Sequence, residues 1–573
     1  VQKTQTGGTG PAPAGAVSVP YHRWGSAVRT SDKESSFFDG IDVSLVGIAD
    51  LAKGGNASFL RSALQQINAF VEDAVAKFNF QKPEAVAPLL AQGLKLTRKS
   101  IADVNASGLI PESKCNVVHE LSVKEQQFNR ALSLALGLTM LATVAPERDA
   151  SGRMAMFTGG MQETFQVAIP GQQFWVKVTA AGQSDAEIKI GKVTLNTANG
   201  ETWNIRPIGN PPQSVGKNES VSQRFKVIIP ENARYTRPYF SRPNIEQPYY
   251  DIQNPKDLNL PTSPYPLVAV VQASYDGVPF EVSQVVQTVH KETGPGLVLQ
   301  PLLVAPAISI TMSPKAGIVP LTGTKFDLKV TVHSNVKGEA KGTLKLDLPQ
   351  GWKSTPAQTN FDLAKDGEAQ QVTFEVTPGK LEAKPYSITA DAEYNGKVYK
   401  EGYDMTGYDG VRPYPLYEPA SFVAQGVDVK VAKGLKIGYV MGTGDEVPES
   451  LQYLGMPVQL LSPQDIASGD LSQYDCIVLG VRAYAARPDL VTYNGRILQY
   501  VHKGGVMFVQ YSTAEYDHNY GPYPYSLTRD AEKVVDETAK VSILDASNPL
   551  MSWPNKITSA DFSGWVEERG HGF

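Results

Sequence analysis

Three loops in the last quarter of this sequence carry side chains that could bind a polar ligand. Each loop follows an apolar run typical of a strand: GTGD follows LKIGYVM, GVRAY follows CIVL, and QYS follows GVMFV. A carboxylate and a guanidinium can each form charged hydrogen bonds to a ligand, and a tyrosine ring can stack on it. The candidate ligand-binding residues are Gly442, Gly444, Asp445, Arg482, Tyr484, Gln510 and Ser512. The alternative is that the glycines form a tight turn and Asp445 caps the next helix.

A second candidate surface is the segment 233–251, ARYTRPYFSRPNIEQPYYD, in which arginines lie among aromatic residues. Arginine forks beside aromatic rings suit stacking on sugars or docking on another protein. The candidate residues of this aromatic and basic surface are Arg237, Tyr239, Phe240 and Arg242. The alternative is a long loop that is ordered by packing its tyrosines onto the β-rich domain.

No group of residues in the sequence predicts catalysis or metal binding. Cys476 begins an apolar strand instead of standing on a sharp turn between small residues, so we expect a buried and inert thiol. The seven histidines are scattered singly, without an HxxH or HExxH pair. His518 beside Asp517 fits a polar loop better than a zinc site, which needs several ligands brought together. We therefore predict no catalytic residue, no metal ligand and no cofactor in this chain.

The charge balance argues against one class of function. The 573 residues include 53 Lys and Arg and 58 Asp and Glu, so the formal net charge is −5. Nucleic-acid binders normally carry a basic excess on one face, so we expect no nucleic-acid partner. The apolar stretch 131–145 is shorter than the roughly 20 residues that a membrane-spanning helix needs, so we expect no membrane span. Two cysteines, Cys115 and Cys476, cannot build a disulfide framework.

The first part of the chain predicts an arm and a helical unit. Residues 1–40 are rich in Gly, Pro and small side chains, which indicates a linker or extended arm. Residues 41–150 form the helical unit, in which apolar residues recur at helical spacing. Two helices are expected to start at Ser58 and Pro83. A third, very apolar helix is expected from a capping box at Ser122 to Met140.

Short strands with turn signals between them fill the middle of the chain. Residues 151–303 predict a β-rich domain with a long Tyr- and Pro-rich loop, and its first two strands are expected on either side of Pro170-Gly171. Residues 304–405 predict an immunoglobulin-like β-sandwich, because apolar and polar residues alternate strictly there. Within that sandwich, Asn395-Gly396 is a strong signal for a two-residue hairpin.

The last quarter predicts a different architecture. Residues 406–433 read as a Pro- and Tyr-rich linker, and residues 434–573 as an α/β domain in which apolar strands alternate with helices. This pattern indicates a parallel sheet of the flavodoxin or class I amidotransferase type, and we expect the domain to be truncated. Ligands of such folds bind outside the carboxyl ends of the strands, where the three polar loops meet.

Six segments, in this order along the chain, resemble one protein family. They are GIDVSLVGIA, TRPYFSRP, IGYVMGTGDEVPESLQYLG, GVRAYAARPDL, GGVMFVQYST and NKITSADFSGWVEERG. Together they resemble the long C-terminal, non-catalytic region of bacterial PIG-L (LmbE-like) deacetylases, from about Phe37 to the end of the chain. The GTGDEVP loop and the NKITSADFSGWVEERG segment are the strongest parts of the resemblance.

The resemblance implies a zinc-dependent N-acetyl-sugar deacetylase domain followed by helical, β-sandwich and amidotransferase-like modules. In that family the zinc ligands and the general base come from an AHPDD-type motif and a later histidine element, and neither is in this sequence. No residue here inherits a metal or catalytic role, so zinc is expected only in the catalytic domain that this chain lacks.

The resemblance thus predicts an accessory region that binds or positions a carbohydrate or glycoconjugate, with its own deacetylase domain as a partner in cis. It also implies a periplasmic or secreted location. Two alternatives stay open. The α/β domain could be a hydrolase or transferase that uses Asp445, Arg482 and Ser512, or the chain could be a protein–protein assembly module that binds through Tyr239 and Phe240.

Overall fold

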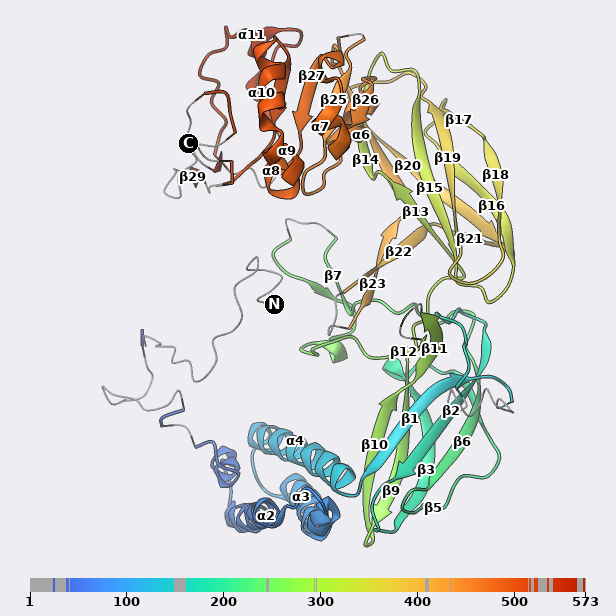
Figure 1. The fold of residues 1–573 in the computed structure, drawn as a ribbon. Helices are drawn as coiled ribbons and strands as arrows, with labels where there is room; N and C mark the ends of the chain where they lie inside the picture. Colours follow the sequence, from blue (N-terminus) through green and yellow to red (C-terminus); the bar gives the residue numbers. More distant parts are fainter. Residues whose placement is uncertain are drawn as a thin grey trace.

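The structure is a computed structural model with four units that follow one another along the chain (Figure 1). It describes residues 24–25, 38–40, 42–148, 161–243, 247–292, 294, 296–407, 412–432, 434–513, 515–516, 520–523, 533–534, 539–563 and 570–571. The predicted multidomain architecture, with a small helical unit followed by β-sandwich-like sheets, is confirmed. No helix in the described part of the chain is long and apolar enough to cross a membrane.

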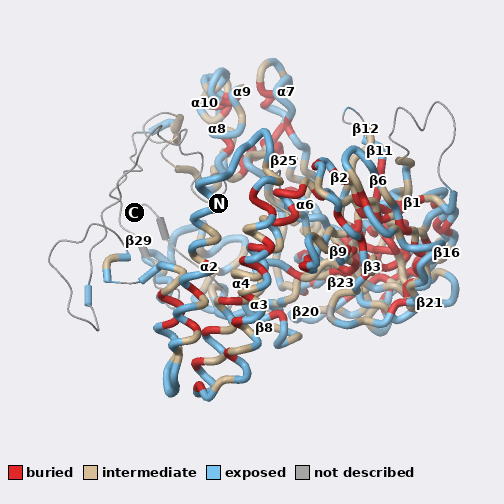
Figure 2. The backbone as a smooth tube through the Cα atoms, turned by 90° about the horizontal axis from the view of Figure 1, so that it is seen from below, coloured by how far each residue is buried: buried red, intermediate tan, exposed pale blue. Residues whose placement is uncertain are grey.

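The helical unit packs its helices around a shared apolar core. Its elements are η1 (Val46–Leu51), α2 (Ser58–Lys77), η2 (Pro83–Val86), α3 (Ala87–Ala106) and α4 (Pro111–Ala135). Leu60 and Leu64 are fully buried on one face of α2, as the helical spacing predicts. Gly93 allows α3 to approach α4 closely, because a Cβ atom at this position would lie 2.4 Å from the ring of Phe128. Figure 2 shows buried stretches alternating with exposed ones along these helices.

The third predicted helix is wrong at both ends. It begins at Pro111, so Ser122 lies inside the helix and caps nothing. It ends at Ala135, and Gly137 follows with a φ of 60°, a conformation that terminates helices. The apolar residues beyond this point form strand β1 (Leu138–Ala145), which pairs with β2 in the next unit. The continuous apolar run 131–145 therefore contains a change from helix to strand. Periodicity alone does not show where this change occurs.

The β-rich unit consists of two sheets with a common core. Their strand orders are β12-β11-β1-β2-β6-β4 and β10-β9-β3-β5. The strands are β1, β2 (Gln173–Gly182), β3 (Ile188–Thr197), β4 (Asn204–Ile208), β5 (Ser214–Val215), β6 (Ser220–Ile228), β9 (Leu267–Tyr275), β10 (Val278–Val285), β11 (Gln287–Glu292) and β12 (Gly296–Pro301). Only the second of the two strands expected around Pro170-Gly171 forms, as β2. The residues before Pro170 make a single bridge, from Ala168 to Val304.

A long excursion, residues 233–264, leaves this unit between β6 and β9. It carries the short hairpin β7 (Phe240–Ser241) and β8 (Asp251–Ile252) and the turn η4 (Pro255–Asp257). Figure 1 shows it between the β-rich unit and the next sandwich.

The second β unit is a two-sheet sandwich. Its sheets have the orders β13-β15-β19-β17 and β14-β24-β20-β16-β18, with β21 beside β20. The strands are β13 (Ile308–Ser313), β14 (Ala316–Pro320), β15 (Phe326–Ser334), β16 (Ala340–Asp347), β17 (Lys353–Thr355), β18 (Gln358–Leu363), β19 (Ala369–Thr377), β20 (Pro385–Tyr394), β21 (Lys397–Tyr399) and β24 (Ser421–Val427). The hairpin predicted at Asn395-Gly396 joins β20 to β21, and both residues have a positive φ as a type I′ turn requires.

The linker predicted for residues 406–433 is wrong in its second half. Strand β23 (Tyr414–Pro419) pairs with β22 (Glu401–Thr406) as a two-stranded ribbon, and β24 lies inside the sandwich sheet between β14 and β20. Phe422 and Ala424 of β24 are fully buried. Val423 between them is also apolar, so the segment shows no clear alternation with polar residues, and it follows a Pro-rich stretch that indicates a loop.

The α/β unit contains the predicted parallel sheet, with four strands in the order β26-β25-β27-β28. Its elements are β25 (Ile437–Val440), α6 (Val447–Tyr453), β26 (Val458–Leu460), α7 (Pro463–Ser468), β27 (Cys476–Leu479), α8 (Ala483–Ala486), α9 (Pro488–Thr492), α10 (Asn494–His502) and β28 (Val506–Val509). All four strands run parallel, so their carboxyl ends meet at one edge.

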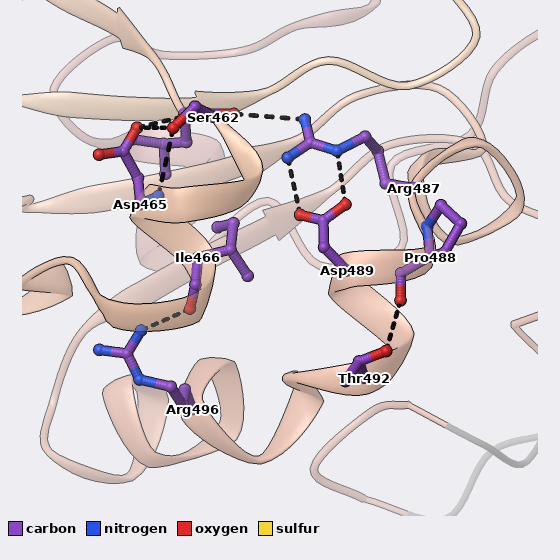
Figure 3. A network of polar contacts seen from close by, with 9 residues as sticks. Ser462, Asp465, Ile466, Arg487, Pro488, Asp489, Thr492 and Arg496 are labelled. Atoms are coloured by element: carbon purple, nitrogen blue, oxygen red, sulfur yellow. Dashed lines mark hydrogen bonds and ion pairs between the residues drawn. The ribbon is translucent and has the colours of Figure 1, made fainter.

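A polar network holds the helices of this unit together (Figure 3). Arg487 makes a two-bond ion pair with Asp489, at 2.8 and 2.7 Å, and also donates to the carbonyl oxygen of Leu461 at 3.2 Å. The hydrogen bonds from Arg487 lower the pKa of the Asp489 carboxyl. Arg496 of α10 donates to the carbonyl oxygen of Gly469 at 2.5 Å. The ARPDL part of the sequence therefore has a structural role, tying α9 to the strand and helices beside it.

Candidate functional site

The three predicted loops meet at the carboxyl edge of the parallel sheet. They follow β25, β27 and β28, which are neighbours in the sheet. The first two loops touch, since the backbone N–H of Thr443 donates to the carbonyl oxygen of Val481 at 2.9 Å. A Cβ atom on Gly442 would lie 2.0 Å from the same oxygen, so this close approach needs glycine.

Tyr439 connects two of the predicted residues beneath this edge. Its side chain is fully buried on β25, and its hydroxyl donates to Asp445 Oδ1 and accepts from Gln510 Nε2 at 2.6 Å. Burial and the neighbouring carboxylate raise the pKa of the Tyr439 hydroxyl far above its usual value, so it remains a donor. Nothing in the residue pattern singles out Tyr439, because a tyrosine inside an apolar strand resembles any other core residue.

Asp445 uses only one of its carboxylate oxygens within the described residues. Oδ1 also accepts from the backbone N–H of Val447 at 3.1 Å, which makes an Asx turn at the start of α6. The N-cap position itself is occupied by Glu446. Asp445 therefore does not cap α6, as the alternative interpretation expected, but lies one residue before the N-cap. The second oxygen, Oδ2, is buried and has no hydrogen-bond partner in the part of the chain that the structure describes.

Arg482 lies at the same edge, but its charge is already paired. It adopts the left-handed conformation with a φ of 51°, and its Nε donates to Glu515 Oε1 at 3.0 Å. Burial works against the ionised Glu515, yet hydrogen bonds from Thr513 and Arg482 dominate and lower its pKa to about 2. Arg482 and Asp445 therefore each have another partner, and no contact joins them to each other.

The role expected for Tyr484 is wrong. Its side chain is only 4% exposed, its hydroxyl donates to Asn494 Oδ1 at 2.6 Å, and its ring stacks on Tyr520 at 4.3 Å. The helix α8 turns this ring into the core, so it offers no surface to a ligand.

Ser512 points back along its own loop and donates to the carbonyl oxygen of Gln510 at 3.4 Å. His518 and Asp517 lie outside the described residues.

The aromatic and basic segment docks against the β22–β23 ribbon. Arg237 pairs with Glu401 of β22, and its guanidinium lies 4.0 Å from the ring centroid of Tyr417 on β23. Tyr239 donates its hydroxyl to the carbonyl oxygen of Leu260 at 2.7 Å. Phe240 is 40% exposed, and Arg242 is also exposed. Arg237 and Tyr239 are thus engaged within the chain, as the packing alternative expects. Phe240 is exposed but packs edge-on against the rings of Tyr239 and Tyr250, and Arg242 lies at the surface.

A pocket of about 330 Å³ lies at the base of the excursion. It is lined by Ala198, Glu201, Trp203, Ala233, Arg234, Tyr235, Thr236, Arg237, Pro238, Tyr239, Gln253, Asn254, Asp257, Ser263, Pro264 and Pro266. Glu201, Trp203 and Asp257 could not be predicted as neighbours, since they come from separate segments that only the fold brings together. A larger apolar pocket of about 1120 Å³ lies in the helical unit, between η1, α2 and α4. Within the described residues, no group of three or more His, Cys, Asp and Glu side chains could hold a metal ion.

Comparison with known families gives one match. Residues 322–395 match the family described as NPCBM-associated, NEW3 domain of alpha-galactosidase. The matched range runs from just before β15 to the hairpin after β20, within the second β unit. No curated protein sequence matches the chain significantly.

Among solved structures, the chain is similar to the apo-form Calx CBD1 domain, with 10% identity and a TM-score of 0.14 over 21% of this chain and 98% of that chain. It is also similar to WR4, a C. elegans MSP family member, with 9% identity and a TM-score of 0.13 over 21% and 97%. The secreted serine protease VesC from Vibrio cholerae matches with 10% identity and a TM-score of 0.18 over 48% of this chain and 54% of that one. At these TM-scores the similarities support no conclusion about fold or function.

Proposed function

We propose that this chain is a carbohydrate-binding accessory region of a PIG-L (LmbE-like) deacetylase, and that it holds the glycan for a catalytic domain elsewhere in the polypeptide. The observation that carries the carbohydrate part is the match of residues 322–395 to a NEW3 domain of alpha-galactosidase, a domain that accompanies a sugar-processing enzyme. The deacetylase part rests on the resemblance of the six sequence segments. Zinc would belong to the catalytic domain, and no residue of this chain is assigned to it.

The contacts between units support a positioning role. The hydroxyl of Tyr453 on α6 donates to the carbonyl oxygen of Asp327 on β15 at 3.0 Å, which joins the α/β unit to the sandwich. Arg98 of α3 donates to the carbonyl oxygen of Pro279 at 2.5 Å, which joins the helices to the β-rich unit. Contacts of this kind join each unit to the next, as the proposed positioning of a bound glycan requires. The resemblance to PIG-L (LmbE-like) deacetylases also implies a periplasmic or secreted location, which we propose for this chain.

The first experiment measures binding of the full chain to a panel of soluble polysaccharides by affinity electrophoresis. We expect at least one polysaccharide to retard the chain in a concentration-dependent way. Migration that no polysaccharide changes, at concentrations that retard a known carbohydrate-binding module, would overturn the carbohydrate role.

The deacetylase part has its own test. An antibody against this chain, used on source cells, should detect a polypeptide heavier by one domain, on the order of 200–300 residues. A native mass near 62.0 kDa would overturn the link to a catalytic domain in cis.

A second candidate function is ligand turnover at the strand edge of the α/β unit. One observation favours it: Asp445 Oδ2 is a buried acceptor without a partner among the described residues. Replacing Asp445 with Ala should then abolish a measured hydrolysis or transfer reaction of the chain. The absence of turnover on acylated sugars and amides would remove this candidate.

A further inference from the structure

We infer that the pocket at the base of the excursion is a saccharide-binding site that selects an uncharged sugar. This inference rests on the proposed carbohydrate-binding function and assigns that function to a place outside the family-matched residues 322–395. The volume of about 330 Å³ falls at the lower end of the range for small-molecule sites, roughly 300–1,000 Å³. This size suits a small ligand of one or two sugar units.

Three separate segments build the pocket. The turn η3 (Ala198–Gly200) and the residues after it form one wall, the start of the excursion forms the second, and η4 with the residues up to Pro266 forms the third. The second wall continues into the contact with the β22–β23 ribbon, through Arg237. The site therefore lies where one unit docks on the next, a common location for ligand pockets.

Glu201 is held in place within the pocket wall. Its Oε2 accepts from the indole Nε1 of Trp203 at 3.0 Å, and its Oε1 accepts from the backbone N–H of Arg234 at 3.3 Å. The side chain of Glu201 is 23% exposed, and Trp203 is 7% exposed. A carboxylate oxygen has more than one lone pair, so Glu201 keeps acceptor capacity after these bonds. It can accept a hydrogen bond from a ligand hydroxyl without being reoriented.

Asp257 supplies a second carboxylate. It belongs to η4, where its backbone N–H donates to the carbonyl oxygen of Asn254 at 2.9 Å, and the whole residue is 5% exposed. Burial of the residue limits the water that can hydrogen-bond to its carboxylate. The hydroxyls of a sugar inside the pocket are hydrogen-bond donors and would take the place of that water.

The charges that line the pocket indicate a neutral ligand. The lining residues include two acidic ones, Glu201 and Asp257, and two basic ones, Arg234 and Arg237, so the formal charges cancel. The guanidinium of Arg237 is already paired with Glu401, and Arg234 Nε lies 3.8 Å from Glu201 Oε1. The carboxylates of the pocket would repel an anionic sugar, and both arginines of the lining already lie near a carboxylate.

The remaining wall residues are suited to the C–H faces of a sugar ring. Six of the twelve uncharged lining residues are aromatic or proline. They are Trp203, Tyr235, Pro238, Tyr239, Pro264 and Pro266. Apolar walls with a few fixed polar groups are typical of specific small-molecule sites.

The test uses isothermal titration calorimetry of the full chain with neutral disaccharides (cellobiose, maltose, lactose and chitobiose) and with digalacturonic acid. The two test variants, Glu201→Gln and Asp257→Asn, keep the side-chain shape and remove the charge. The control variant is Asp185→Asn, a 71% exposed carboxylate that pairs with Lys217 outside the pocket. We expect a neutral disaccharide to bind, and each test variant to weaken its binding roughly tenfold or more, with no change in the control.

Polysaccharide binding measured on the same variants separates this inference from the proposed function. If the wild-type chain binds saccharides and neither test variant changes the affinity, the pocket is not the site, although the proposed function stands. A preference for digalacturonic acid would also overturn the inference. Binding of no saccharide would overturn both. A substitution at a buried position could unfold the chain, so Arg234→Ala provides a further test, because the Arg234 side chain is 76% exposed. If this variant and the Glu201→Gln variant are both folded and both bind saccharide with unchanged affinity, the inference is contradicted.

Discussion

The ring of Tyr235 stacks on the ring of Tyr417, with centroids 6.0 Å apart and planes inclined by 10°. Tyr235 lies at the start of the excursion of the β-rich unit, and Tyr417 lies on β23 of the ribbon that extends the sandwich. Arg237 completes this contact by pairing with Glu401 and lying over the Tyr417 ring. Arg412 repeats the arrangement nearby, with its guanidinium 3.6 Å from the ring centroid of Tyr265. The excursion is thus a docking element that joins the two β units.

Replacing Arg237 with Ala should loosen this contact. The variant loses a cation–π contact and a half-exposed ion pair, which together contribute about 1 kcal/mol. Amide hydrogen exchange of the β23 peptide (Tyr414–Pro419) should accelerate roughly fivefold, because the ribbon opens more often. Mass spectrometry of deuterated peptides measures this rate.

The control for this prediction is Lys217→Ala, which removes an exposed ion pair with Asp185 elsewhere in the β-rich unit. It should leave exchange in β23 unchanged, since isolated surface ion pairs contribute little. Equal exchange rates in β23 for the wild type and the Arg237 variant would show that the excursion does not hold the ribbon.

Much of the fold could be predicted because the relevant signals are local. Phe326, Leu328 and Val330 alternate with polar residues on β15, and all three are buried in the sandwich core. The four strands of the parallel sheet each appear as a short apolar run followed by a polar loop. These patterns need no information from distant residues.

The errors arose where tertiary contacts decide the outcome. The apolar run after Ala135 becomes strand β1 only because β2 is available to pair with it. The sequence around Tyr484 does not distinguish an exposed ring from a buried one. The packing of Tyr520 on this ring decides that it is buried. The saccharide pocket was not predictable either, because Glu201 and Asp257 lie in separate segments and neither has a sequence motif of its own.

Two glycine substitutions should have opposite effects on stability. Gly396 has a φ of 72° in the β20–β21 hairpin, so Gly396→Ala should destabilise the sandwich by about 1 kcal/mol. Gly495 lies in helix α10 without a positive φ, so Gly495→Ala should stabilise the α/β unit by up to about 1 kcal/mol. No atom lies within 4 Å of the new Cβ at either position, so the backbone alone determines the sign. Urea unfolding of each variant measures both changes, and a shared sign would contradict the assigned backbone conformations.

The two cysteines should react at very different rates. Cys115 is exposed on α4, whereas Cys476 is partly buried at the start of β27, and burial raises the pKa of its thiol. Since the thiolate is the reactive form, Ellman's reagent at pH 8 should modify one thiol quickly and the other at least tenfold more slowly. Cys115→Ser should remove the fast phase and Cys476→Ser the slow one. Loss of the fast phase in Cys476→Ser would show that the β27 thiol is accessible and activated.

The ion pair of Glu515 with Arg482 should make the stability of the α/β unit depend on pH in acid. The pKa of Glu515 is lowered from 4.5 to about 2 in the folded chain, because hydrogen bonds from Thr513 and Arg482 outweigh the effect of burial. The unfolded chain therefore binds the proton more readily than the folded chain does. The stabilisation is fully present above about pH 4.5 and is lost as the pH falls towards 2.

Replacing Glu515 with Gln should remove this part of the pH dependence. The free energy of unfolding of the variant should be lower than that of the wild type at pH 6, and the difference should shrink steadily between pH 4.5 and 2. Urea unfolding at a series of pH values, followed by hydrogen exchange of peptides from the α/β unit, measures it. Glu449→Gln on α6 is the matched control: it removes an exposed carboxylate in the same unit and should leave the slope of stability against pH nearly unchanged. A difference between wild type and Glu515→Gln that stays constant over this pH range would show that the carboxylate is not held by Arg482, and would leave the Arg482 guanidinium available to a ligand at the strand edge.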